Sequence, residues 1–585
     1  MKIPVAVLFA GLLAAHDARA GGQGRIIPED RMADWRPGVA VGVPGGIPTD
    51  RTTLIDVTRP PYNADPTGAA DASAAIGQAV AKAGENEVVY LPAGTYRLNR
   101  GIGLGAKSRI TIRGDGPDRT FLKIYPGCGA AISVGSGGGD WWYQDRLKLN
   151  VLGGPPRGAT VLTLGDTKPL DAYPNGGVGQ ICQVALKNDP KLPVIVPAKF
   201  EYMRRQNVRI VARTAATVTV APGLLCDHPD ELAPRLAPVG RMAEFVGIED
   251  LAVDGENAAA QVGISVSTAF GCWVRNVHVL NIANYHLSIS DSLRCEVRRS
   301  LVMRRKGKGS NGAGFLVGTT CSSLFEDNVL LEQFPHIEVN ASAGNVFAYN
   351  FCHDSTINGI VGCSIDSNHG AHSNFNLYEG NVSPKFQSDG YHGGSSHDTA
   401  FRNWFHGTSD KTDQFWICVH LNRFTRNYSI VGNVLGSKGH PWLYDNGENG
   451  HGYDQHFIYV LGMPNMGNGG FSGKAQPSRG KYWKDWEKMA SGPAGAGPGP
   501  NGFQELDLDV RATTLLRGNY NWKDKGVPPG ESLNGTPLPR SLYRAEKPDW
   551  FGNLAWPAFG PDTAFEKNRI PAQVRFEGMK KRLYP

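Results

Sequence analysis

The chain has 585 residues, a formal net charge of +6, 19% charged residues and 74 glycines. So small a net charge at this length argues against a nucleic-acid-binding protein. No stretch after the N-terminus approaches twenty apolar residues, so a membrane-spanning helix is not expected. Many glycines with few charges favour a fold with frequent tight turns, and a repetitive solenoid could hold the whole length in one body.

The first twenty residues have the pattern of a secretory signal. Lys2 is basic, residues 5–15 are apolar, and Ala18 and Ala20 supply small side chains before a cleavage point at Gly21. We therefore predict a signal peptide over 1–20, an N-terminal extension over 21–50, and a secreted or periplasmic protein. Such compartments permit disulfides, but the nine cysteines leave at least one thiol free. Cys182 and Cys226 are the pair considered for a disulfide.

Residues 51–147 are expected to form an N-terminal cap and the first coils. The segment contains short strand patterns, and apolar spacing of three and four after Asp71 predicts a capping helix. The informative pieces are Asp56-Val57, Ala64-Asp65-Pro66-Thr67-Gly68, Ala75-Ile76, Tyr90-Leu91-Pro92-Ala93-Gly94-Thr95-Tyr96 and Arg113-Gly114-Asp115-Gly116. They resemble the N-terminal signature of the pectate lyase superfamily, in the form found in pectate-lyase-3-like proteins. The resemblance implies a right-handed parallel β-helix and a polysaccharide substrate. It transfers no catalytic residue, because the calcium-binding aspartates and the arginine motif of pectate lyases have no close match here.

Two further regions complete the predicted organisation. Alternating segments within 148–240 indicate a small β-rich insertion, with an irregular long coil as the alternative. Main β-helix coils are predicted over 241–460, and a C-terminal coil with a packing tail over 461–585. The fold class is therefore all-β, a single-stranded right-handed parallel β-helix.

A recurring asparagine carries the prediction of the main coils. It follows a short apolar strand at Asn276, Asn328, Asn350, Asn381, Asn403 and Asn433, with Ser300 as a substitute and Asn519 as a late example. From Asn276 to Asn433 the successive members lie 22 to 31 residues apart, a typical solenoid period. Asparagine tolerates left-handed backbone at turns, and amides stacked on successive coils can bond one another as a ladder.

Candidate site residues gather between Asp366 and Arg402, where four histidines with glycine neighbours fall within 29 residues. Counting back from the repeated asparagines places polar side chains at one position per coil, where they could line a groove. The predicted catalytic residues are His369, Tyr391, His392 and Arg402. The predicted substrate-binding residues are Glu338, His372, Lys385, His397, His420 and Arg423. Asp366 and Asp389 could orient a histidine or hold Ca²⁺ through oxygen ligands, and no other cofactor is expected.

This residue set favours a polysaccharide lyase acting by β-elimination on a uronate-containing, acidic extracellular polysaccharide. Histidine and tyrosine would move protons, while a cation would neutralise the carboxylate. An inverting glycosidase on the same scaffold is the rival, which needs paired carboxylates. The sequence has no Asp-Asp pair and no Arg-Ile-Lys of the polygalacturonase kind, although carboxylates from different coils could still pair.

A metal site and a binding module are also compatible with the sequence. A metal site could be built from His369, His372, His392 and His397. A non-catalytic glycan-binding solenoid could present Trp404, Trp416 and Trp442 to sugar rings. The sequence does not decide oligomeric state.

Overall fold

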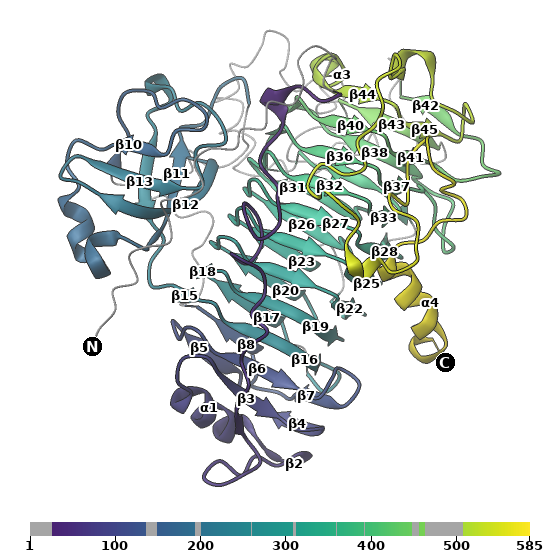
Figure 1. The fold of residues 1–585 in the computed structure, drawn as a ribbon. Coiled ribbons are helices and arrows are strands. Elements are labelled where there is room, and N and C mark those ends of the chain that lie inside the picture. The colour runs from purple at the N-terminus through teal and green to yellow at the C-terminus, as the bar shows by residue number, and fades with distance from the viewer. Residues whose placement is uncertain are drawn as a thin grey trace, which may run out of the picture.

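The computed structural model describes residues 26–135, 149–192, 201–258, 260–307, 312–357, 360–390, 392–446, 456–462 and 507–584. The predicted fold class is confirmed: long parallel sheets wind into a right-handed β-helix with little helix (Figure 1). The predicted signal peptide lies outside the described residues. Within those residues, no helix is long and apolar enough to cross a membrane.

Each complete coil contributes two short strands to one sheet and a third strand to another. The first sheet contains β1 (Thr53–Asp56), β2 (Thr67–Asp71), β3 (Glu87–Leu91), β4 (Gly94–Leu98), β6 (Thr111–Gly114), β7 (Thr120–Ile124), β16 (Gly247–Asp254), β19 (Trp273–Leu280), β21 (Glu296–Arg298), β22 (Leu301–Met303), β24 (Leu324–Glu326), β25 (Val329–Leu331), β27 (Val346–Ala348), β28 (Phe351–His353), β32 (Leu377–Glu379), β33 (Val382–Ser383), β36 (Thr399–Phe401), β37 (Trp404–Phe405), β40 (Ser429–Val431), β41 (Val434–Leu435), β44 (Leu515–Arg517) and β45 (Tyr520–Asn521). We call it the 22-stranded sheet.

The second sheet, called the 11-stranded sheet, carries the site described below. Its strands are β5 (Ile102–Gly105), β8 (Ala130–Val134), β17 (Val262–Ser267), β20 (Tyr285–Ser290), β23 (Ala313–Gly318), β26 (Ile337–Asn340), β31 (Ile365–Gly370), β34 (Phe386–Ser388), β38 (Ile417–Leu421), β43 (Phe457–Leu461) and β42 (Leu443–Asp445).

The interior of the helix is a continuous apolar column. Because successive strands pair in parallel and in register, equivalent side chains stack from coil to coil. The rings of Phe325, Phe347 and Tyr378 show this, with centroids 4.7 and 5.0 Å apart and nearly parallel planes. Burying such aromatic surface is the main favourable term holding the coils together.

The predicted asparagine ladder runs from Asn328 to Asn519. Each amide donates from Nδ2 to Oδ1 of the next asparagine at 2.9–3.0 Å, through Asn350, Asn381, Asn403 and Asn433. These asparagines are fully buried. The same Oδ1 atom also accepts a hydrogen bond from the backbone N–H of the preceding asparagine. The ladder therefore pairs polar groups that burial would otherwise leave without partners.

Two details of the asparagine prediction are wrong. The left-handed residue is the one before the ladder asparagine, as at Asp327 with φ 58° and Arg402 with φ 53°. Asn276 itself has φ 52° and donates to Asp250, so it lies one position off the ladder. The pairing of His278 with Leu301 places Ser300 opposite Val277, not opposite Asn276.

Residues 149–238 form a separate antiparallel sheet beside the solenoid (Figure 1). Its strands are β9 (Leu149–Asn150), β10 (Val161–Thr163), β11 (Ile181–Leu186), β12 (Arg204–Arg213), β13 (Thr217–Ala221) and β14 (Arg235–Pro238). We call this sheet with its connections the insertion. One face docks on the turns that follow the 11-stranded sheet: Asn207 Nδ2 donates to the carbonyls of Ser292 and Thr319, and Gln183 donates to Asp291.

Terminal segments cover the solenoid. Helix α1 (Ser73–Lys82) packs its buried face, including Ile76 and Val80, against the first coils. At the C-terminal end, α3 (Leu508–Thr513) packs against β39 (Thr425–Arg426) and β43. The later segment with Leu538 and Phe559, together with α4 (Pro571–Leu583), lies along the 22-stranded sheet (Figure 1). All nine cysteines are free thiols, so the disulfide considered between Cys182 and Cys226 is not formed.

Candidate active site

The 11-stranded sheet carries a column of polar side chains on its outer face. Register pairs Glu338 with Asp366, Asp366 with Gln387, and Gln387 with His420 on β26, β31, β34 and β38. Their neighbours, such as Ile365 and Phe386, belong to the interior core, so alternation turns the polar set outward. All four polar side chains are nevertheless buried, which places them in a recessed and weakly solvated layer.

A bulge in β31 shapes the centre of this layer. Glu338 pairs with Asp366, and Asn340 pairs with Gly370. Between these two pairs β31 advances by four residues, whereas β26 advances by two. The extra backbone projects His369 toward the next coil. Bulges of this kind occur beside functional sites, where they re-aim a side chain. The inserted residues are also why counting back from the asparagines does not give the true register here.

His369 and Asp389 form an ion pair between successive coils. The imidazole Nδ1 lies 2.8 Å from Asp389 Oδ2, and the two side chains are 32% and 14% exposed. Burial opposes protonation of the imidazole. The carboxylates of Asp389, Glu338 and Asp366 outweigh that effect and raise the pKa of His369 to about 10. At neutral pH the pair is therefore imidazolium and carboxylate.

The carboxyl groups of Asp366 and Glu338 both have a raised pKa, which favours their protonated forms. Burial, followed by the charge of Asp389, raises the pKa of Asp366 well above its usual value. Burial likewise raises the pKa of Glu338, whose Oε1 accepts a 2.9 Å hydrogen bond from Asn340. Asp366 Oδ1 accepts from the backbone N–H groups of Asn368 and Asp389 at 3.2 and 3.3 Å. Burial thus favours the protonated form of Asp366 and Glu338, whereas the imidazolium favours the ionised form of Asp389, and such a difference divides acid and base roles in active sites.

His392 packs against the ion pair. Its ring lies edge-on to that of His369, with centroids 5.2 Å apart. Burial, and then the positive charge of His369, lower the pKa of His392 to about 3, so this histidine is neutral. The predicted catalytic Tyr391 lies outside the described residues. The structure therefore brings together His369, His392, Glu338, Asp366 and Asp389 from the predicted set.

Cys363 joins this cluster. Its sulfur and one oxygen each of Asp366 and Asp389 lie within 4.8 Å of one another. Ca²⁺ takes six to eight oxygen ligands, whereas this donor set offers a soft thiol and two carboxylates, one of them already bound to His369. The set therefore fits Ca²⁺ poorly.

Two predicted substrate-binding residues line the buried floor beside the cluster. Lys385 donates from Nζ to the carbonyl of Val361 at 2.9 Å and lies 4.2 Å from the ring centroid of Phe415. Burial lowers its pKa to about 7. His420 is fully buried and meets Phe415 edge-on at 5.8 Å. Both are covered by Phe415, so they support the site from beneath.

The remaining histidines of the stretch point elsewhere. His372 shares a 2.8 Å hydrogen bond with Ser396 at the edge facing the insertion. His397 stacks on Phe375 with centroids 4.9 Å apart. The four histidines considered for a metal site therefore do not converge. Arg423 lies over the ring of Phe424, 5.3 Å from its centroid.

Arg402 is not part of the cluster, contrary to the sequence prediction. Its guanidinium makes two 2.8 Å bonds to Asp562 and donates to carbonyls of the C-terminal segment, including Phe559. At 2% exposure it fastens that segment to the 22-stranded sheet. The tryptophans considered as sugar platforms also pack inward: Trp416 and Trp442 belong to the core, and Trp404 contacts Phe559.

Sequence reasoning missed Cys363 and Asn368. Asn368 donates to the carbonyls of Asp389 and Gly393, at 3.0 and 2.9 Å, and so fixes the segment that carries the ion pair. Its place between Asp366 and His369 is the only sequence signal that could have singled it out.

Comparisons with known proteins agree with the architecture. Residues 59–143 match the family model described as rhamnogalacturonase A/epimerase, pectate lyase-like. The tailspike of Pseudomonas phage phi297 is similar in structure, with a TM-score of 0.51 and 14% identity over 71% of this chain and 70% of that one. The tailspike of Pseudomonas phage LKA1 gives a TM-score of 0.45 and 11% identity over 71% and 80%. The A-module of an Azotobacter vinelandii mannuronan C-5 epimerase gives 0.26 and 16% over 70% and 96%. No curated protein matches the chain. The family match is confined to residues 59–143, the N-terminal cap and first coils, and the phi297 tailspike is similar to this chain in the fold of its stacked coils.

Proposed function

We propose that this protein is a secreted enzyme that hydrolyses a polysaccharide at the cluster of Asp366, Asp389 and His369. The observation that carries the proposal is the pairing of a carboxyl group of raised pKa with an ionised carboxylate, supplied by neighbouring coils. Glycosidases need such a pair flanking the scissile bond. The superfamily and the rhamnogalacturonase name of the matching family model favour a polysaccharide as the substrate.

Each residue then has a defined role. Asp366, whose raised pKa favours the protonated form, gives its proton to the oxygen of the leaving sugar as the bond from that oxygen to the anomeric carbon breaks. The Asp389 carboxylate attacks the anomeric carbon and forms a glycosyl ester. Water then attacks the same carbon, returns its proton to Asp366 and releases Asp389. His369 holds Asp389 ionised and oriented, and is a positioning residue.

Elimination is the second candidate, and the charge on His369 favours it. An imidazolium beside the substrate could neutralise a uronate carboxylate while a base removes the neighbouring proton. His392 is neutral but a weak base at a pKa of about 3. The imidazolium is already paired with the carboxylate of Asp389, which leaves it less able to neutralise a uronate, so hydrolysis fits the cluster better.

The two reactions leave different products. The purified protein would be incubated with neutral and acidic polysaccharides, and both reducing ends and ultraviolet absorbance of unsaturated ends would be followed. Hydrolysis predicts reducing ends without new absorbance, and loss of activity in Asp389→Asn but not in the exposed control Asp549→Asn. New absorbance would instead support elimination. Silence in both assays, with binding retained, would leave a glycan-binding protein and overturn the enzymatic proposal.

A further inference from the structure

Two cysteines face each other on successive coils at the start of the main solenoid. The residues on either side of them pair in parallel at one and the same offset, namely Phe270 with Leu293 and Trp273 with Glu296. Cys272 therefore lies opposite Cys295. Neighbouring strands are about 4.8 Å apart, which is within the ~4.4–6.8 Å that a disulfide spans between Cα atoms.

Both sulfur atoms lie in the apolar interior, where Cys272 and Cys295 belong to the core. The thiol of Cys295 reaches back to the carbonyl oxygen of Ala269, on the coil of Cys272, at 3.7 Å. The thiol of Cys272 reaches back in the same way to Ala243, at 3.8 Å. One sulfur therefore already leans toward the partner's coil. Rotation of the Cys272 side chain about its Cα–Cβ bond would turn the second sulfur toward the first.

The two cysteines occupy a position that later coils fill with hydrogen-bonding side chains. Ser323, Asn345 and Asn376 each accept a bond there from a backbone N–H of the preceding coil, at 2.9–3.0 Å. Sulfur is a weak acceptor, and Cys272 Sγ lies 3.3 Å from the backbone nitrogen of Val246. The thiol of Cys272 therefore gives up only a weak contact when its side chain rotates.

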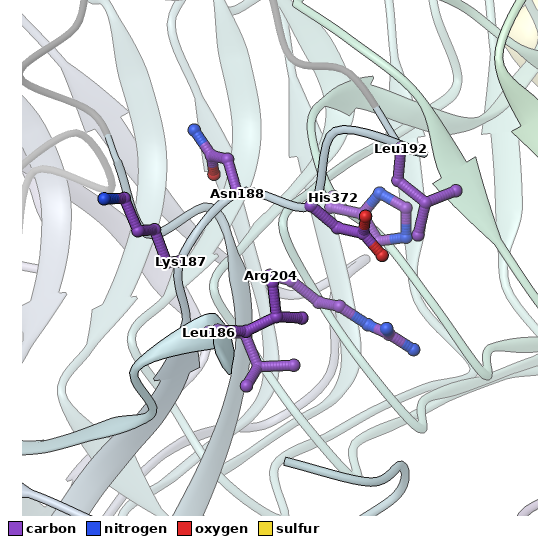
Figure 2. Close-up of a pocket in the computed structure, with 8 residues that line it drawn as sticks. Leu186, Lys187, Asn188, Leu192, Arg204 and His372 are labelled. Atoms are coloured by element: carbon purple, nitrogen blue, oxygen red, sulfur yellow. The ribbon is translucent and has the colours of Figure 1, made fainter. Parts of the chain in front are cut away.

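The insertion packs on the turns that carry these cysteines. Phe270 and Leu293, each two residues before a cysteine, cluster with Ile181 of the insertion. Farther along the solenoid, the insertion meets the coil of β31 at a small pocket that includes His372 (Figure 2). A covalent link between the two turns would fix the spacing of the surface at one end of this contact.

We propose that Cys272 and Cys295, which are free thiols in this structure, are a redox pair whose oxidation to a disulfide ties together two coils that support the insertion. One thiolate attacks a disulfide oxidant, such as glutathione disulfide, and a glutathione thiolate leaves. The second thiolate displaces the other glutathione from the mixed disulfide. Two electrons pass to the oxidant, and the two thiol protons end on the two glutathione molecules. The inference does not depend on the proposed catalytic function.

The bond has to form before the coils close around the sulfur atoms. Burial, and then the neighbouring thiol of Cys295, raise the pKa of Cys272 well above its usual value, so the folded chain holds little thiolate there. The two coils are consecutive in sequence, and contacts between segments close in sequence form early in folding. An oxidant present during folding can therefore reach both thiols.

Peptide mapping detects the bond directly. The full-length protein would be produced in a bacterial periplasm with glutathione disulfide in the medium, and separately in a reducing cytosol. Both samples would be alkylated under denaturing conditions and digested with trypsin. Cleavage after arginine places Cys272 on the peptide 242–275 and Cys295 on the peptide 295–298. The bond then yields one linked species, which dithiothreitol splits into these two peptides.

Two variants serve as controls. The double variant Cys272→Ser/Cys295→Ser carries the side chain that Ser323 already presents at this position on the next coil. Cys321→Ser removes a buried thiol that faces Leu293 and Ala343 instead of another cysteine. Circular dichroism would verify the folding of both variants, and the peptide map of the wild-type protein needs neither of them.

We expect the linked species to predominate in periplasmic wild type and in Cys321→Ser, and to be absent from cytosolic protein. Periplasmic wild type should melt about 2 °C or more above cytosolic wild type, whereas the two preparations of the double variant should melt together. Three results would each overturn the inference: alkylation of both peptides in the periplasmic protein, linkage of either cysteine to a different partner, or equal melting of the linked and reduced wild-type proteins.

Discussion

His369 Nδ1 and Asp389 Oδ2 lie 2.8 Å apart although the residues belong to successive coils, and the contact depends on the bulge in β31. The bond holds a proton on the histidine and a charge on the carboxylate. The protonation state of the site therefore depends on how the strands of neighbouring coils align at the bulge.

Removing the negative charge of Asp389 should lower both the activity and the pKa of His369. In Asp389→Asn the strongest support for the imidazolium is lost, so the pKa of His369 should fall from about 10 toward or below 6.5. Turnover should fall by about 10² to 10⁴-fold. Histidine NMR titration and initial rates would measure the two effects. An unchanged titration would show that Asp389 does not hold the proton.

The same pair predicts how stability changes with pH. Because the folded pKa of His369 is raised above its usual 6.5, the pairing stabilises the fold fully below that pH and is lost as pH rises through about 10. Chemical denaturation between pH 6 and about 10.5 should show this loss in wild type and less of it in His369→Gln. Identical pH slopes for the two proteins would contradict the ion pair.

Asp366 makes the opposite contribution. Burial and Asp389 raise its folded pKa, so above pH 3.8, where the unfolded carboxyl ionises, the wild-type fold is penalised. Asp366→Asn keeps the acceptor oxygen for Asn368 and removes the penalty. It should melt at a higher temperature than wild type at pH 7, match it below pH 3.8, and lose activity. A lower melting temperature at pH 7 would show that the carboxylate is ionised in the fold.

The spacing of the carboxyl pair predicts the stereochemistry of hydrolysis. Oxygens of Asp366 and Asp389 lie within 4.8 Å, short of the ~6.5–9.5 Å that admits an attacking water between the groups. We therefore expect retention of the anomeric configuration, observed by proton NMR of the first product. Inversion would mean that a different pair, such as one including Glu338, performs the reaction.

Sequence alone predicted the coils and the cap, because stacking repeats the same turn and strand chemistry in every coil, and it singled out the stretch that contains His369 and Asp389. It could not place the individual side chains around the bulge, since two extra residues in β31 shift everything after Asp366 relative to β26. The sequence also assigned Arg402 to the site, as a cation at the end of the histidine-rich stretch that could neutralise a substrate carboxylate. Only the folded chain shows that the C-terminal segment brings Asp562 to that guanidinium.

The asparagine ladder gives a matched test of buried against half-exposed amides. Asn381→Ala removes the Oδ1 that accepts from the backbone N–H and the side-chain amide of Asn350, and it also removes the bond that Asn381 donates to Asn403. This change should lower the free energy of unfolding by about 2–4 kcal/mol. Asn276→Ala, off the ladder and bonded only to Asp250 among the side chains described, should cost less than about 1 kcal/mol. Denaturant titration of both variants would compare them, and equal losses would contradict the ladder as a stabilising element. The difference should appear because only the interior position leaves buried polar groups without partners.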